Sequence, residues 1–341
     1  MATTVSDATS TSKQKSFVEK NWILLTILGV AVIAVAVGYA ANPQITSSLL
    51  ASALRQSIPL ILGAMCGIFC ERSGIVNIGI EGTMLLSAFV AFLANVYIGN
   101  LFIALLIGVA GGASMGALLA FMSVTLKMDQ IIGGTVVNIL AIGLTGYFYQ
   151  QGLSTQGKIL PLPLGPLAEI PLIGPVLFNN PPITYLTLIL VFVAHYVLFN
   201  TRWGLRTRAV GEHPRAADTV GINVYFMRYA NVLIGSCLAG LAGAFLTLEA
   251  VGTFERGMTN GRGFVALAVM LFGKRTPFGV FGAAFLFGLF SAGQTQLQFS
   301  DLINIPHQFI GMLPYLLTIF VLAGFVGRTR DPKALGQPYE K

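Results

Sequence analysis

The residue types that carry enzyme chemistry are scarce in this sequence and form no catalytic pattern. His195, His213 and His307 lie in three separate segments, and no metal-ligand spacing joins them. The stretch 273–276 (Gly-Lys-Arg-Thr) resembles the end of a phosphate-binding loop. Ala268 stands where that motif has a glycine, however, and no Ser or Thr directly follows the lysine. We therefore expect no catalysis, no metal and no cofactor in this chain, which should not hydrolyse ATP by itself.

The composition indicates a membrane protein. Of the 341 residues, 55% are hydrophobic and 10% are charged, with a net charge of +7. A soluble domain carries about 25% charged residues. The lysines and arginines stand in short segments between apolar runs, which indicates membrane topology rather than nucleic-acid binding. Cys66, Cys70 and Cys237 all lie in apolar segments and are predicted to be packing residues.

Ten apolar segments predict an all-α, polytopic membrane protein with one transmembrane domain over 21–327. A span needs roughly 20 apolar residues. The first segment is longer than the apolar core of a signal peptide, about 7–15 residues, so we expect it to be retained. The ten segments are 22–41, 49–70, 77–98, 101–126, 131–151, 183–200, 225–252, 260–273, 278–298 and 308–327.

The distribution of basic residues predicts the orientation. With the tail 1–20 inside, most lysines and arginines fall in inner segments, and the outer segments hold only Lys158, Arg256 and Arg262. This asymmetry predicts that both termini are cytoplasmic, including the C-terminal tail 328–341. The even number of crossings agrees with that orientation.

Two segments are poor simple spans. Residues 260–273 are too few to cross a core of about 30 Å, which predicts a broken or re-entrant helix. The second segment contains Arg55, Gln56 and Pro59, and the proline should kink it. Interrupted helices of this kind line cavities in transporters.

The outer connection 152–182 contains seven prolines, which we take to exclude a helix. Two interpretations of this connection stay open: an extended segment that covers the outer face, and an irregular linker. Within the membrane segments, glycines at small-xxx-small spacing, such as Gly112 and Gly116 or Gly235 and Ala239, predict close helix packing rather than sites.

The stretch 71–82 (ERSGIVNIGIEG) places polar groups inside the membrane region. Asn77 and Glu81 stand four residues apart, so a helix would put them on one face. An ionisable residue at this depth is costly and usually faces a cavity or a partner. Glu81 is therefore interpreted either as a lining element of a solute path or as a polar clamp to Arg72 or Asn138.

Other intramembrane polar and aromatic residues extend this hypothesis. Amide side chains suit an uncharged, hydrogen-bonding solute better than an ion, and phenylalanines could stack on a planar base. The candidate residues of the translocation path are Asn77, Glu81, Asn138, Phe264 and Gln294.

The inner loop 201–224 predicts a two-turn helix. Pro214 suits the first turn of a helix, and Gly221 suits a left-handed end. So short a helix is unstable alone. Docking on a cytoplasmic partner would explain it, and a solvated topogenic loop is the alternative.

The runs 54–86 and 202–224 together carry a resemblance to a known family. The sequence is similar to the permeases of bacterial ABC importers for ribose, branched-chain amino acids and nucleosides, and most to the nucleoside or simple-sugar subgroup. The similarity extends from about residue 45 to 327. The resemblance implies a multi-pass permease of the bacterial inner membrane that works by alternating access.

The resemblance also implies the partners. A separate ATPase would bind ATP and Mg, and an ATPase with two fused nucleotide-binding domains is one form that it could take. A second homologous permease would complete the path, and a binding lipoprotein or periplasmic protein would deliver the solute. The coupling loop on the ATPase would comprise Glu212, His213, Pro214, Arg215, Ala216, Ala217, Asp218 and Gly221.

The solute implied by the resemblance is a nucleoside, with ribose or another simple sugar as the alternative. From the residues themselves, a secondary transporter driven by protons or sodium is a competing reading, with Glu81 and Glu249 as its relay.

Overall fold

The structure is a computed structural model that describes residues 35–153, 155, 157–299, 312, 316 and 330–340. The chain divides into two compact units, 1–47 and 48–341. In the first, the described residues 35–41 are helical up to the start of helix α2. Every site below lies in the second unit. The tail 1–20, most of the segment 22–41 and nearly all of 308–327 lie outside the described residues.

The described residues are mostly helical and contain almost no sheet, which confirms the all-α, multi-pass prediction. Seven helices are long and apolar enough to cross a membrane in the part of the chain that is described. They match seven of the ten expected segments. These helices are α2 (Pro43–Arg72), α3 (Ile80–Ile98), α4 (Leu101–Ala120) continued by the π-helical η1 (Phe121–Thr125), α5 (Gln130–Phe148), α7 (Pro182–Asn200), α10 (Val224–Phe245) continued by the π-helical η3 (Leu246–Val251), and α12 (Pro277–Phe299).

The eighth expected segment is a half-length helix, α11 (Arg262–Phe272). Its 11 residues extend about 16 Å at 1.5 Å per residue, roughly half of a bilayer core. The prediction that segment 260–273 is too short for a simple span is therefore confirmed, and its broken or re-entrant course in the membrane stays a prediction. Helix α2, in contrast, is continuous through Pro59, so the expected interruption of the second segment is not found there.

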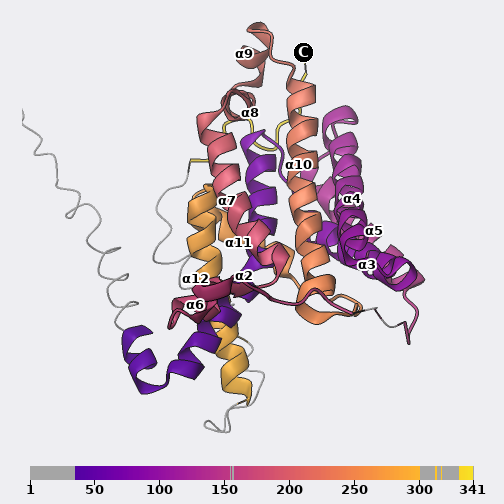
Figure 1. Ribbon diagram of the computed structural model, residues 1–341. Helices are drawn as coiled ribbons and strands as arrows, with labels where there is room; N and C mark the ends of the chain where they lie inside the picture. The colour runs from indigo at the N-terminus through magenta and orange to yellow at the C-terminus, as the bar shows by residue number, and fades with distance from the viewer. Residues whose placement is uncertain are drawn as a thin grey trace, which may run out of the picture. The chain divides into compact units, whose positions relative to one another are not determined.

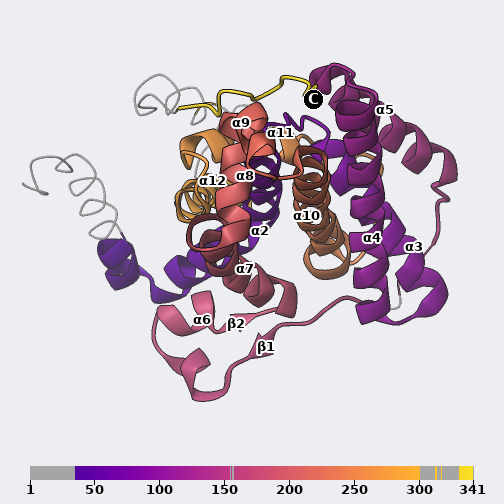
Figure 2. The ribbon, with the colours of Figure 1, turned by 90° about the horizontal axis from the view of Figure 1, so that it is seen from above.

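Small residues bring helices α4 and α10 into backbone contact, side by side in Figure 2. A methyl group built on Gly112 would lie 2.5 Å from the Cα atom of Gly240. One built on Gly116 would overlap the Ser236 hydroxyl, and one on Gly235 would meet the Cys66 carbonyl oxygen at 2.8 Å. The small-xxx-small spacing thus marks packing faces, as the sequence predicted.

We expect Gly112→Ala to lower the stability of the folded protein by about 1–3 kcal/mol, because the added methyl group forces two backbones apart. Gly143→Ala in α5 is the matched control, since nothing described in the structure lies within 4 Å of a methyl group there. Thermal unfolding in detergent measures both. Equal melting temperatures for the two variants would contradict the close α4–α10 contact.

The proline-rich connection 152–182 contains two helical turns, so the prediction that its prolines exclude a helix was wrong. A 3₁₀ turn, η2 (Gly165–Glu169), and a short helix, α6 (Ile173–Leu177), lie between two paired antiparallel strands, β1 (Leu162–Pro163) and β2 (Asn179–Asn180). Pro166 and Pro175 each stand within the first three residues of their turn. The N–H groups of a first turn have no intrahelical partner, so proline costs little there.

The loop 201–224 folds into two helices at one end of the second unit, the end where residues 330–340 also lie (Figure 1). Helix α9 (Pro214–Thr219) is the predicted two-turn helix, and Gly221 follows it with φ 82° in the left-handed region. Helix α8 (Arg202–Glu212) was not predicted. Its arginine-rich sequence has too few apolar residues to stand out among membrane segments.

Candidate functional site

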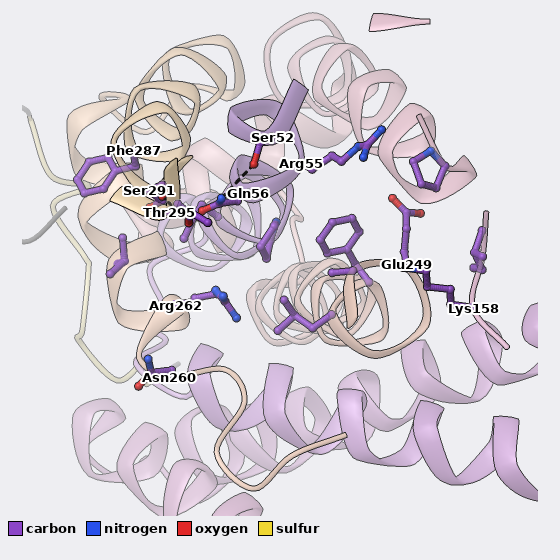
Figure 3. A pocket seen from close by; sticks show the side chains of 18 of the residues that line it. Ser52, Arg55, Gln56, Lys158, Glu249, Asn260, Arg262, Phe287, Ser291 and Thr295 are labelled. Atoms are coloured by element: carbon purple, nitrogen blue, oxygen red, sulfur yellow. Dashed lines mark hydrogen bonds between the residues drawn. The ribbon is translucent and has the colours of Figure 1, made fainter. Parts of the chain in front are cut away.

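A cavity of about 670 Å³ opens between helices α2, η3, α11 and α12 and the segment 158–161 (Figure 3). Its walls mix apolar carbon with hydroxyl, amide and charged groups. Its size falls within the usual range of small-molecule sites, about 300–1,000 Å³. The polar lining residues are Ser52, Arg55, Gln56, Lys158, Glu249, Asn260, Arg262, Ser291, Gln294 and Thr295.

Helical spacing explains why these side chains share one space. Ser52, Gln56 and Pro59 recur at steps of three and four along α2, which places them on one face. Ser291 and Thr295 stand four apart on α12 and line the cavity with Gln294. In Figure 3, Gln56, Ser291 and Thr295 gather on one side, and Arg55, Glu249 and Lys158 on the other.

Two charged residues of the cavity hold the connection 152–182 and the start of α7 in place by hydrogen bonds. Arg55 donates from Nε to Asn180 Oδ1 at 3.2 Å and from Nη2 to the Asn179 carbonyl oxygen at 3.0 Å. The Glu249 carboxylate accepts from the Ile183 backbone N–H at 2.9 Å and from the Thr184 hydroxyl at 2.6 Å. Charges inside the membrane region are therefore partnered, as their cost requires.

Two helices begin inside the bundle, and at the start of each a side chain from another helix accepts from one or two free backbone N–H groups. Glu81, in the first turn of α3, accepts from the N–H groups of Gly261 and Gly263 at 2.8 and 2.6 Å, at the start of α11. Asn138, in the middle of α5, accepts from the Gly82 N–H at 2.7 Å, at the start of α3. Backbone groups at this depth must find such partners, because lipid offers none.

The Glu81 contact also places a cavity residue. Gly261 and Gly263 flank Arg262, whose side chain lies in the cavity in Figure 3. The clamp interpretation of Glu81 thus has a geometric basis, although its partners are two backbone amides of α11 rather than Arg72 or Asn138.

The five candidate residues of the translocation path do not share one location relative to the cavity. In the described part of the chain, Gln294 is the one that lines the cavity. Asn77 is buried in the connection before α3, where its amide donates weakly to Cys66 and Cys70 Sγ, so it does not share a helix face with Glu81. Glu81 accepts at the start of α11, where Arg262 lines the cavity, and Asn138 accepts at the start of α3. Phe264 is 47% exposed and lies outside the cavity lining.

The cavity has an aromatic contribution from residues outside the five candidates. Phe287 and Phe245 line it, whereas Phe254 is buried against Phe89 and Tyr149 on another face of the bundle. The spacing of polar residues at 52, 55, 56 and at 291, 294, 295 is the pattern from which this lining could have been found.

The predicted coupling loop presents one buried and one exposed face. Ala217 is 3% exposed and packs with Val210 and Tyr339. Arg215, Ala216 and Val220 face outward, and Val220 is 74% exposed. Glu212 and His213 stand at the junction of α8 and α9. A substitution that probes a docked partner therefore belongs at Arg215 or Val220, since a large residue at Ala217 would disrupt the packing of α9 itself.

Comparison with known families was decisive. The model of the family described as "Branched-chain amino acid transport system / permease component" matches residues 49–322. The chain belongs to this permease family. The matched range runs from α2 past α12 and so contains the cavity, both capped helix starts and α9. No solved structure matches the chain.

Three curated relatives of the permease match over most of their length. The "Guanosine ABC transporter permease protein NupQ" of Bacillus subtilis is 39% identical over 316 residues, covering 87% of this chain and 98% of that protein. The "Nucleoside ABC transporter permease protein NupC" of Lactococcus lactis is 40% identical, covering 86% and 96%. The "Putative glucose ABC transporter permease protein TsgC13" of Haloferax volcanii is 33% identical, covering 86% and 98%.

Proposed function

We propose that this permease forms the translocation path of an ATP-driven importer for nucleosides in a bacterial cytoplasmic membrane. The observation that carries the proposal is the cavity between α2, η3, α11 and α12 in a chain of the permease family. Its amides, hydroxyls and the planar rings of Phe245 and Phe287 suit a solute with a flat base and a polar sugar. The guanosine and nucleoside relatives support that solute class.

The energy would come from a separate ATPase that holds ATP and Mg. The exposed face of α9, with Arg215 and Val220, would dock on it, and a second homologous permease and a solute-binding lipoprotein or periplasmic protein would complete the importer. Both termini are then cytoplasmic. Nucleotide binding would shift the permease between two states of the cavity. The size of that shift is set by the difference in nucleotide affinity between the two states.

One other solute and one other energy source have weaker support than a nucleoside and ATP. A simple sugar is the second candidate, because a relative named for glucose is 33% identical to this chain. Ion coupling through Glu81 and Glu249 is less favoured, since backbone N–H groups or the Thr184 hydroxyl already occupy both carboxylates.

The test is uptake of labelled guanosine by the complete importer in proteoliposomes, with or without internal ATP. We expect Gln294→Leu to reduce the uptake rate about three- to tenfold, as expected for a lost neutral hydrogen bond. Gln296→Leu is the matched control, because Gln296 lies on the same helix outside the cavity lining. Uptake driven by an ion gradient without ATP would overturn the proposal that ATP supplies the energy. Equal uptake rates for the two variants would overturn the proposal that the solute passes through this cavity.

A further inference from the structure

Residues 331–340 lie across the end of the bundle that carries α8 and α9 (Figure 1). At the start of this segment, Asp331 Oδ1 is 2.8 Å from Arg275 Nη1. Arg275 is 4% exposed and also pairs with Glu71 at the end of α2. Asp331 therefore attaches the segment to the corner between α11 and α12.

The middle of the segment is held by backbone hydrogen bonds. The Ala334 N–H donates to the Gly211 carbonyl oxygen at 2.9 Å, and the Gly336 N–H donates to the Gly74 carbonyl oxygen at 3.1 Å. A methyl group on Gly74 would lie 3.2 Å from the Ala334 carbonyl oxygen, and the φ of Gly74 is +90°. Glycine at this position thus lets the segment approach closely.

The end of the segment packs on α9. The Tyr339 side chain is 5% exposed and joins Val210, Ala217 and Met227 in one apolar cluster. Desolvation and a hydrogen bond with the Asp218 side chain raise the pKa of the Tyr339 hydroxyl. Arg228 of α10 donates from Nη1 to the Gln337 carbonyl oxygen at 2.9 Å.

These contacts join α9 to the helices that line the cavity. The corner at Arg275 is where α11 ends and α12 begins, and Glu71 ends α2 beside it. All three helices reach the cavity with other parts of their length. Residues 331–340 therefore form a continuous series of contacts from α9 to the corner where α2, α11 and α12 meet.

We propose that residues 331–340 form a coupling strap, and that Tyr339 is the positioning residue that holds α9 to it. This inference rests on the proposed function, because it assigns the strap the task of carrying motion from a docked ATPase to the cavity. Tyr339 touches neither the solute nor ATP, and it acts through α9.

The contacts of the strap suit a moving part rather than a core element. Its last ion pair, Lys127 to Glu340, lies between exposed side chains, and the Lys127 ammonium lowers the pKa of the Glu340 carboxyl. Pairs of this kind add little stability. The Tyr339 cluster is separate from the main core of the bundle. Loss of Tyr339 should therefore leave the bundle folded.

The experiment compares Tyr339→Ala, Tyr339→Phe and Glu340→Ala in the full importer, measuring ATP hydrolysed per guanosine imported. We expect Tyr339→Ala to raise this ratio about fivefold or more, the range of ordinary coupling free energies, in protein that remains folded in detergent. Tyr339→Phe keeps the ring in the cluster and should restore coupling. Glu340→Ala should resemble the wild type.

The outcomes separate the strap from the function it rests on. If the unaltered importer moves guanosine with ATP and Tyr339→Ala keeps the wild-type ratio, the strap is refuted while the proposed function stands. A proportional fall of uptake and hydrolysis with loss of folded protein would also refute it, because that result indicates a merely structural role. If the unaltered importer shows no ATP-driven uptake, the proposed function itself fails.

Discussion

Replacing Arg275 by methionine should destabilise the folded permease by about 3–5 kcal/mol, the usual cost of removing one partner from a buried ion pair. The Arg275 Nε atom lies 2.5 Å from Glu71 Oε2, and both side chains are almost fully buried. Without the guanidinium, the Glu71 carboxylate is left unpaired. Thermal or denaturant unfolding in detergent measures the loss.

Lys274 provides an unusually close control for this substitution. It precedes Arg275 directly and shares its φ of 52°, but its side chain is exposed. Lys274→Met should therefore change stability little. The double variant Glu71→Met with Arg275→Met should recover most of the loss, because it removes both charges together. A double variant as unstable as Arg275→Met alone would show that the pair is not the cause.

Replacing Glu81 by alanine should reduce guanosine uptake more than tenfold, because about 1–3 kcal/mol is lost for each backbone N–H left unsatisfied. Two such groups, at Gly261 and Gly263, depend on this carboxylate. Glu81→Gln should lie between alanine and the wild type, since an amide oxygen can accept from one of the two while its NH₂ group opposes the other. Uptake per amount of folded protein in the membrane is the measurement.

Glu255 offers the comparison for Glu81. It is exposed in the connection that leads to α11, so Glu255→Ala should leave uptake per folded protein unchanged. A Glu81→Ala variant with wild-type uptake would show that α11 needs no cap. If uptake falls only in proportion to the amount of folded protein, Glu81 stabilises the fold and does not act on transport through Arg262.

The membrane helices could be predicted from the sequence because their cause is local. Runs of apolar residues in a chain with 10% charge need no knowledge of the fold to be assigned to lipid. The short helix α9 was equally accessible, since Pro214 and Gly221 mark its start and end. The short length of α11 could be predicted because segment 260–273 has too few residues to cross a bilayer core of about 30 Å.

The site was harder to predict because it depends on contacts between distant segments. The Glu81 carboxylate was recognised as exceptional, yet its partners lie 180 and 182 residues further along the chain. Asn77 was misplaced because the chain turns at glycines before α3 begins. The role of Arg55 depends on Asn179 and Asn180 in the connection 152–182, which no helical spacing relates to α2.

The proline-rich connection 152–182 contributes to the wall of the cavity as well as connecting α5 to α7. Lys158, Ile159, Pro161 and Pro181 belong to the lining, and Arg55 holds the loop in place from α2. Surface connections tolerate exchange and length change far better than packed helices do. A substitution in this connection would therefore change the wall of the cavity without repacking the membrane helices.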